Sequence, residues 1–142
     1  MGAKSGSSTR YDIKYHFVWI PKYRKRLLTS VRQAYLKYLL RRVAEEWAMA
    51  IVEMEVMEDH VHLFLEAPPR LSPAQIMNTI KSITAREMFA KFPEMRNTLW
   101  AGELWADGYY VATAGDKVTA EAVRRYIRGQ RQHELPLHDG QE

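Results

Sequence analysis

The sequence predicts an α+β fold in which helices pack on an antiparallel sheet. Short segments rich in aromatic and β-branched residues, one of which alternates with a period of two, are typical of strands. Longer segments carry apolar residues at helical spacing. These segments follow one another in the order β-α-β-β-α-β-α, and 142 residues are enough to bury one core.

The first strand is expected at residues 11–20, which are rich in aromatic and β-branched side chains and end at Pro21. The first helix is expected at residues 31–49, with Ser30 as a plausible cap. Its apolar residues recur at helical spacing: Tyr35, Leu36, Leu39, Leu40, Val43 and Trp47.

An antiparallel hairpin is expected next, because residues 51–57 alternate with period two and residues 60–65 read as a second strand after a turn. Strict alternation assigns the side chains of residues 51–57, the first strand of this hairpin, to two faces. One face would carry Ile51, Glu53, Glu55 and Met57, and the other Val52, Met54 and Val56.

The second half of the chain completes the pattern. Ser72 is expected to cap a helix at residues 73–92, with Pro73 in its first position. Residues 99–107 read as a loop, 109–114 as a strand and 119–132 as the last helix. This order indicates a ferredoxin-like or RRM-like antiparallel sheet.

The domain organisation expected is a flexible N-terminal segment at residues 1–10, a single domain at 11–133 and a short C-terminal tail at 134–142. The N-terminal residues are rich in Gly and Ser and contain no apolar stretch, so no secretory signal is expected there. No apolar run approaches the roughly 20 residues of a membrane helix, so we expect no membrane partner and a cytoplasmic location.

Composition restricts the chemistry. The sequence contains no cysteine, which excludes disulfides and thiolate metal ligands. Its formal net charge is +4 and its sequence pI is about 9.4, a balance that weakly favours a polyanionic partner. The basic residues gather in clusters at 22–26, 41–42 and 124–131, although solvated charges around a core would give a similar pattern.

The pair His60 and His62 is the first candidate site. On a strand, residues i and i+2 point to the same face, so both imidazoles can converge on one ion while Val61 packs behind them. A His-x-His pair also arises by accident, and two ligands do not make a metal site. A third ligand is therefore needed.

The last helix offers that ligand, because Tyr126 and Gln130 are four residues apart and share a helical face. Two imidazoles and an amide oxygen leave positions for water and a phosphate oxygen, which suits Mg²⁺ or Mn²⁺, with Zn²⁺ also possible. A phenol has a pKa near 10 and needs such help to act as a nucleophile near neutral pH. Neighbouring arginines, Arg124 and Arg125 among them, are suited to DNA phosphates.

The sequence resembles the single-tyrosine HUH transposases of insertion sequences that move as single-stranded DNA. The shared motifs run through nearly the whole chain. They are Tyr15-His16-Phe17-Val18-Trp19, Lys22-Tyr23-Arg24, Asp59-His60-Val61-His62-Leu63, Leu71-Ser72-Pro73, Leu99-Trp100, Leu104-Trp105, Gly108-Tyr109-Tyr110, and Val123-Arg124-Arg125-Tyr126-Ile127 with Gln130.

The resemblance implies an HUH endonuclease fold, with Tyr126 as nucleophile and His60, His62 and Gln130 as ligands of Mg²⁺ or Mn²⁺. Family members form a 5′-phosphotyrosine and a free 3′-OH, and they need no nucleotide cofactor. They recognise DNA hairpins at element ends. They act as homodimers, in many of which the tyrosine helix of one subunit completes the partner's active site.

Other residues have weaker assignments. Candidate DNA contacts are Lys22, Arg24, Lys25, Arg26, Lys81, Arg86, Arg124 and Arg125. Trp100 and Trp105 are candidates for base stacking or for core packing, and Tyr109 and Tyr110 for packing or stacking. Three histidines without ligand spacing are interpreted as structural or surface residues: His16, His133 and His138.

Three alternatives remain open. A domesticated relative associated with repetitive extragenic palindromes would use the same chemistry on a host repeat. A non-catalytic RRM-like module would bind nucleic acid without His-x-His, but the sequence lacks an aromatic-rich RNP-type strand. A nuclease that uses activated water would not need Tyr126.

Overall fold

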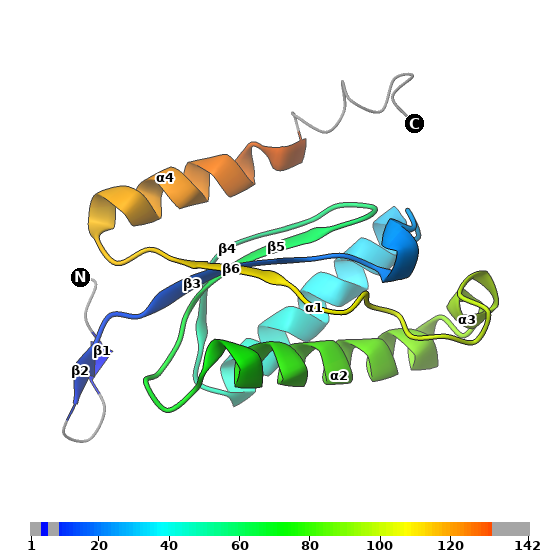
Figure 1. The fold of residues 1–142 in the computed structure, drawn as a ribbon, viewed down its shortest axis with the longest axis horizontal. Coiled ribbons are helices and arrows are strands. Elements are labelled where there is room, and N and C mark those ends of the chain that lie inside the picture. The colour runs from blue at the N-terminus through cyan, green and yellow to red at the C-terminus, as the bar shows by residue number, and fades with distance from the viewer. Residues whose placement is uncertain (1–3, 6–8, 132–142) are drawn as a thin grey trace.

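The computed structural model describes residues 4–5 and 9–131, and its main feature is a four-stranded antiparallel sheet with strand order β4-β5-β3-β6 (Figure 1). A two-stranded sheet precedes it. The elements are β1 (Lys4–Ser5), β2 (Arg10–Tyr11), β3 (Lys14–Trp19), η1 (Lys22–Arg24), α1 (Ser30–Glu46), β4 (Ala50–Val56), β5 (Val61–Glu66), α2 (Pro73–Lys91), α3 (Met95–Thr98), β6 (Tyr110–Thr113) and α4 (Lys117–Arg128).

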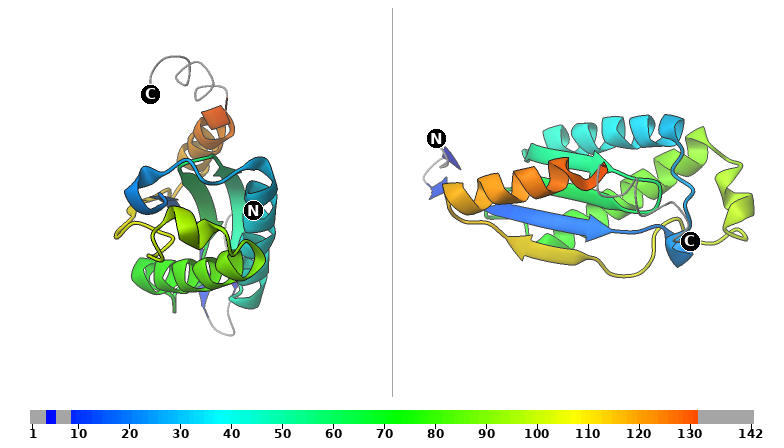
Figure 2. Two further views of the ribbon diagram at one scale, coloured as in Figure 1. Left: turned by 90° about the vertical axis from the view of Figure 1, so that its right-hand side faces the viewer. Right: turned by 90° about the horizontal axis from the view of Figure 1, so that it is seen from above.

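This topology confirms the predicted α+β, ferredoxin-like fold. Helix α1 connects β3 to β4, and α2 lies between β5 and β6 in the chain. Both helices cover one face of the sheet, whereas α4 covers the other face (Figures 1 and 2). The described residues therefore form three layers, with α4 as the one helix among them on the second face.

Each face of the sheet has its own apolar cluster. Phe17, Trp19 and Leu63 belong to the larger cluster, which also contains the buried residues of α1 and α2. The smaller cluster joins Phe64 of β5 to Ala120 and Ile127 of α4. Because this second cluster is small, apolar burial contributes less to holding α4 than it does to holding α1 and α2.

The alternation predicted for β4 is wrong at its start. A register shift between Ile51 and Glu53 pairs Ile51 with Leu65 and Glu53 with Phe64, so one residue of β4 is unmatched. Such a bulge reverses the facing of the residues that precede it. Ile51 thus packs with the larger cluster and Val52 with the smaller one, while Glu53 and Glu55 lie on the α4 side, where arginines of that segment contact them.

Helix α2 begins with a complete capping box, as its sequence predicts. The backbone N–H of Gln75 donates to Ser72 Oγ at 3.1 Å, and the Ser72 N–H donates to Gln75 Oε1 at 2.8 Å. The two hydrogen bonds thereby satisfy two backbone N–H groups that have no acceptor within the helix.

We expect Ser72→Ala to lower the free energy of unfolding by about 1 kcal/mol, because it removes the acceptor for the Gln75 N–H. Thermal or denaturant unfolding followed by circular dichroism measures this. Ser82→Ala is the matched control, since Ser82 is exposed in the same helix and makes no cap. An equal effect of both substitutions would contradict the capping role.

The remaining boundaries differ in small ways from the prediction. Short helix α3 falls at residues 95–98, for which no helix was expected. Helix α4 ends at Arg128, with Gly129 as its C-cap, and residues 130–131 are helical again. Residues 4–5, in the segment predicted to be flexible, pair with Arg10 and Tyr11. The predicted tail at 134–142, with His138, lies outside the described residues, as does His133.

Candidate active site

The paired histidines lie at the start of β5 on the face that α4 covers. Val61 and Leu63 point the other way, into the larger apolar cluster, so alternation along the strand directs His62 toward α4. His60 immediately precedes the strand. Both imidazoles are buried, and their ring centroids are 5.2 Å apart.

Each imidazole makes a specific contact through its Nδ1 atom. His60 Nδ1 is 2.8 Å from Asp59 Oδ1, and His62 Nδ1 is 3.1 Å from Nε2 of His16. Asp59 also accepts a hydrogen bond from Arg24 Nε at 3.1 Å. A hydrogen-bond partner at Nδ1 fixes the orientation and the tautomer of an imidazole ring. In both His60 and His62, Nε2 is therefore the nitrogen that suits an ion.

Electrostatics keep His62 in the form that a metal requires. Burial, followed by the proximity of His60 and His16, lowers the pKa of His62 to about 4, and a hydrogen bond with the Gln130 side chain acts in the opposite direction. His62 is therefore neutral at pH 7, and a neutral imidazole is a metal ligand. Burial raises the pKa of Asp59, but its hydrogen bond with His60 and the charge of Arg24 produce a net lowering. Asp59 is thus a carboxylate.

Helix α4 places the predicted nucleophile beside these rings. The centroid of the Tyr126 ring is 5.8 Å from that of His62 and 6.3 Å from that of His16. Tyr126 is 56% exposed, so a large substrate can reach its hydroxyl. A cleft of about 550 Å³ between α4 and the sheet is lined by His16, His62, Tyr110 and Tyr126, among others.

Gln130 lies beyond the end of α4 and still reaches the histidine pair through its hydrogen bond with His62. Its Nε2 is also 3.5 Å from the backbone oxygen of Tyr126. The structure thus brings together all four residues predicted for the catalytic centre, His60, His62, Tyr126 and Gln130, within one chain.

These residues fit a divalent metal on the chemistry of their donors. Within residues 4–5 and 9–131, no three His, Asp or Glu side chains form a group that could hold an ion. Gln130, the third ligand expected from the sequence, would supply an amide oxygen, and its side chain already contacts His62. Two neutral imidazoles and an amide leave coordination positions for oxygen ligands, as Mg²⁺ and Mn²⁺ prefer.

Ion pairs between α4 and β4 hold the tyrosine helix over the site. Glu53 Oε1 lies 3.2 Å from Arg128 Nη2 and 3.5 Å from Arg124 Nε. Arg131 contacts Glu55 at 3.1 Å and donates to the backbone oxygen of Val56 at 2.9 Å. The position of Tyr126 therefore depends on these pairs as well as on the small apolar cluster.

The predicted DNA contacts fall into separate places. Arg24 and Arg26 pair with Asp59 and Glu58 of the β4–β5 turn, whereas Lys22 pairs with Glu103 in the loop before β6. Lys25 Nζ lies 5.0 Å from the centroid of the Trp100 ring. Arg24 and Arg26 thus join the basic segment to Asp59 and Glu58, which immediately precede His60 in the chain.

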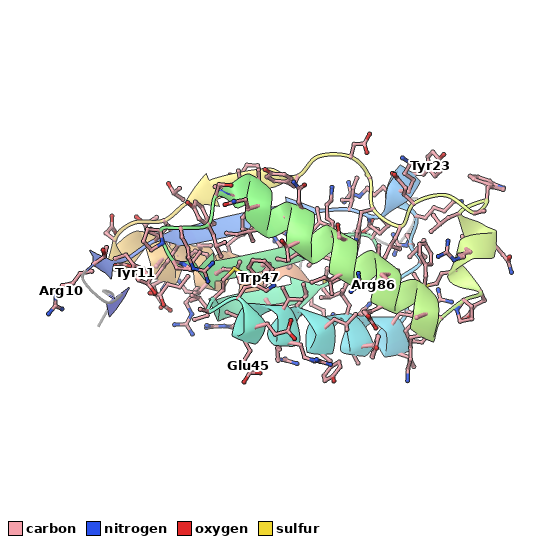
Figure 3. The ribbon with its side chains drawn as sticks, turned by 90° about the horizontal axis from the view of Figure 1, so that it is seen from below. Arg10, Tyr11, Tyr23, Glu45, Trp47 and Arg86 are labelled. Atoms are coloured by element: carbon pink, nitrogen blue, oxygen red, sulfur yellow. The ribbon has the colours of Figure 1, made fainter. Side chains whose placement is uncertain are left out.

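The other four predicted contacts differ in surroundings. Lys81 donates to the backbone oxygens of Ala106 and Gly108, both at 2.8 Å, which ties α2 to the loop before β6. Arg86 is exposed on α2, in the helical layer away from α4 (Figure 3). On α4, Arg124 contacts Glu53 and Glu121, whereas Arg125 is mostly exposed.

Two residues at the site escaped the sequence interpretation. The sequence indicates only a structural or surface role for His16, and it gives Asp59 no role beyond its place in the motif that contains His60 and His62. His16 pairs in register with Phe64, two residues from His62 on β5, so knowledge of the β3–β5 register would have placed both imidazoles on one face. Trp105 proves to be a core residue whose Nε1 donates to Thr84 at 2.9 Å, whereas Trp100 is exposed.

A ferredoxin-like sheet that brings a tyrosine helix over a histidine pair defines the class of single-tyrosine transposases. The family model for IS200-like transposases matches residues 9–130. The chain belongs to this family.

Curated relatives agree with that assignment. The ISDra2 transposase TnpA of Deinococcus radiodurans is 34% identical over 131 residues, which cover 92% of this chain and 93% of the relative. The transposase of insertion sequence element IS200 from Salmonella typhimurium is also 34% identical, over 89% of this chain and 82% of the relative.

Solved structures show the same fold. A transposase from Deinococcus radiodurans, described as putative, superposes with a TM-score of 0.73 at 35% identity, over 89% of this chain and 97% of its own. A REP-associated tyrosine transposase bound to a REP hairpin superposes with a TM-score of 0.64 at 15% identity, over 92% of this chain and 75% of its own. In the part of the chain that the structure describes, no helix is both long and apolar enough to cross a membrane.

Proposed function

We propose that this transposase cleaves and rejoins single-stranded DNA at insertion-sequence ends through a covalent 5′-phosphotyrosine on Tyr126. The observation that carries the proposal is the contact between the Tyr126 ring and the buried His62, with Gln130 on the following turn. The accessible tyrosine and His62 line the same cleft of one chain, and Gln130 reaches that imidazole. Membership in a transposase family argues against a non-catalytic RRM-like module.

In the proposed reaction, the Tyr126 oxygen attacks the DNA phosphorus and the bond from phosphorus to the 3′-oxygen breaks. Tyr126 gives up its proton, and the departing 3′-oxygen gains one to become a free 3′-OH. A divalent Mg²⁺ or Mn²⁺ would polarise a non-bridging phosphate oxygen and position the scissile phosphate. Rejoining reverses these steps when a 3′-OH attacks the phosphotyrosine, so no nucleotide cofactor is needed.

The proposed DNA substrate carries hairpins near the ends of the element, and the proposed active form is a homodimer. Tyr126 faces His62 of its own chain in this structure. Mixing Tyr126→Phe protein with His62→Ala protein shows whether the tyrosine helix completes the site of its own chain or that of the partner chain. If the tyrosine helix completes the partner's site, mixed dimers regain activity. If each chain completes its own site, the mixture stays inactive.

An adduct assay tests the proposed function. The purified protein is incubated with Mn²⁺ or Mg²⁺ and labelled single-stranded DNA from the flanks of its gene, and the products are separated on denaturing gels. A DNA-linked protein band that EDTA abolishes is expected. Cleavage without any adduct would instead indicate a nuclease that uses water. DNA binding without cleavage or adduct, across both element ends, would refute the strand-transfer chemistry.

A further inference from the structure

Two large aromatic side chains are exposed side by side near the histidine pair. Tyr23 of η1 is 65% exposed and Trp100, after α3, is 73% exposed. Their ring centroids are 5.7 Å apart with the planes at 70°. Figure 3 shows Tyr23 at the end of the molecule opposite Arg10 and Tyr11. Neighbouring exposed aromatics of this size point to a binding surface.

The backbone holds this pair in a strained arrangement. Tyr23 and Trp100 have φ values of 59° and 51°, in the left-handed region that non-glycine residues rarely occupy. The segments that carry them are hydrogen-bonded together, since the Lys22 N–H donates to the Leu104 oxygen at 2.8 Å and the Ala106 N–H donates to the Ile20 oxygen at 3.0 Å. Backbone strain maintained by surrounding structure is characteristic of ligand sites.

The segment that carries Tyr23 is rich in cations, three of which pair with Glu103, Asp59 and Glu58. Lys25 Nζ lies 5.0 Å from the Trp100 ring centroid, and the pair is flanked by Lys22, Arg24 and Arg26. Glu103 and Glu58 are also present and contact Lys22 and Arg26. Aromatic faces between cations match the alternation of base and phosphate along single-stranded DNA.

The segment that carries Tyr23 is joined to the candidate catalytic centre through Arg24. Arg24, the residue after Tyr23, donates to Asp59, and Asp59 contacts His60. The Leu28 N–H also donates to the Glu58 oxygen at 3.1 Å, so the segment that follows η1 is joined to the β4–β5 turn. Figure 1 shows η1 beside that turn. A strand with one phosphate at Tyr126 could therefore extend its neighbouring bases over Tyr23 and Trp100.

We propose that Tyr23 and Trp100 form a base-stacking site for unpaired nucleotides that flank the phosphate attacked by Tyr126, with Lys25 contacting the DNA backbone. The inference rests on the proposed function, because it takes single-stranded DNA as the substrate. It assigns these residues a role in holding the strand, whereas Tyr126 carries the chemistry. Stacking tolerates any base, so the site contributes affinity and alignment more than sequence recognition.

The test measures binding of a fluorescein-labelled single-stranded oligonucleotide from the gene's flank by anisotropy, with Tyr126→Phe protein so that no cleavage occurs. Trp100→Ala is expected to raise the Kd roughly tenfold, within the range for loss of one stacked base, and Trp100→Phe to keep most of the affinity. Tyr38→Ala is the matched control, since it removes an exposed aromatic from α1, and its Kd should not change.

Oligonucleotides with single abasic sites separate stacking from other effects. Where an abasic site removes the stacked base, the parent Tyr126→Phe protein should lose affinity. The protein that also carries Trp100→Ala should bind this abasic oligonucleotide as weakly as it binds intact DNA. The stacking site would be overturned if Trp100→Ala bound intact DNA as tightly as the parent protein. It would also be overturned if Trp100→Ala lost the same affinity, relative to the parent protein, on intact DNA and on every abasic oligonucleotide. Adduct formation by the wild-type protein in the same series would show that the proposed function survives that result, whereas no binding by any variant would refute both.

Discussion

Tyr126→Phe should abolish the covalent protein–DNA adduct and leave binding of single-stranded DNA nearly unchanged. The substitution removes only the attacking oxygen, and the loss of a nucleophile typically lowers the reaction rate by a factor on the order of 10⁴ or more. The ring remains available to pack against His62 and His16. Adduct yield on denaturing gels and Kd from anisotropy measure the two effects separately.

The fold should tolerate this change, because Tyr126 is exposed and no hydrogen bond of its hydroxyl is found among the described residues. We expect the free energy of unfolding to shift by less than about 0.5 kcal/mol. Tyr110→Phe is a suitable comparison, since Tyr110 lines the same cleft and its ring lies 5.9 Å from His16. An adduct that persists in Tyr126→Phe and disappears in Tyr110→Phe would show that Tyr110, and not Tyr126, is the nucleophile.

The fold was predictable from the sequence because its signals are local. Helical spacing in α1, the cap at Ser72 and the aromatic run of β3 each depend on residues that are close in the chain, and the structure confirms all three. The bulge in β4 was not predictable. Its cause is non-local, because Ile51 packs with the larger cluster while Glu53 and Glu55 meet the arginines of the α4 segment.

The difference between local and non-local signals also explains how much of the candidate active site was predictable. His60 and His62 are two residues apart, and Tyr126 and Gln130 are four apart, so periodicity alone suggests each pair. That the two pairs meet follows from the packing of α4 on the sheet. His16 is 46 residues from His62, and no local pattern reports their 3.1 Å contact. The arginines of α4 are candidate phosphate contacts on sequence grounds. Arg124 and Arg128 also contact Glu53, a partner that only the tertiary structure identifies.

We expect His16→Phe to weaken Mn²⁺ binding by about 10- to 100-fold, the usual effect of losing a partner that orients a ligand. When His62 keeps Nε2 for the metal, its Nδ1–H donates to His16 Nε2, 3.1 Å away. Phenylalanine fills similar space but accepts no hydrogen bond, so His62 loses the contact that fixes its tautomer. Isothermal titration with Mn²⁺ in the absence of DNA measures this without reference to activity.

His16→Gln provides the decisive comparison, because its side-chain oxygen can accept the same hydrogen bond. Recovery of most of the Mn²⁺ affinity in this variant would assign His16 a positioning role, whereas His62→Ala, which removes a ligand, should bind far more weakly than either. If His16→Phe bound Mn²⁺ as the wild type does, with an unchanged melting temperature, the orientation of His62 would not depend on His16.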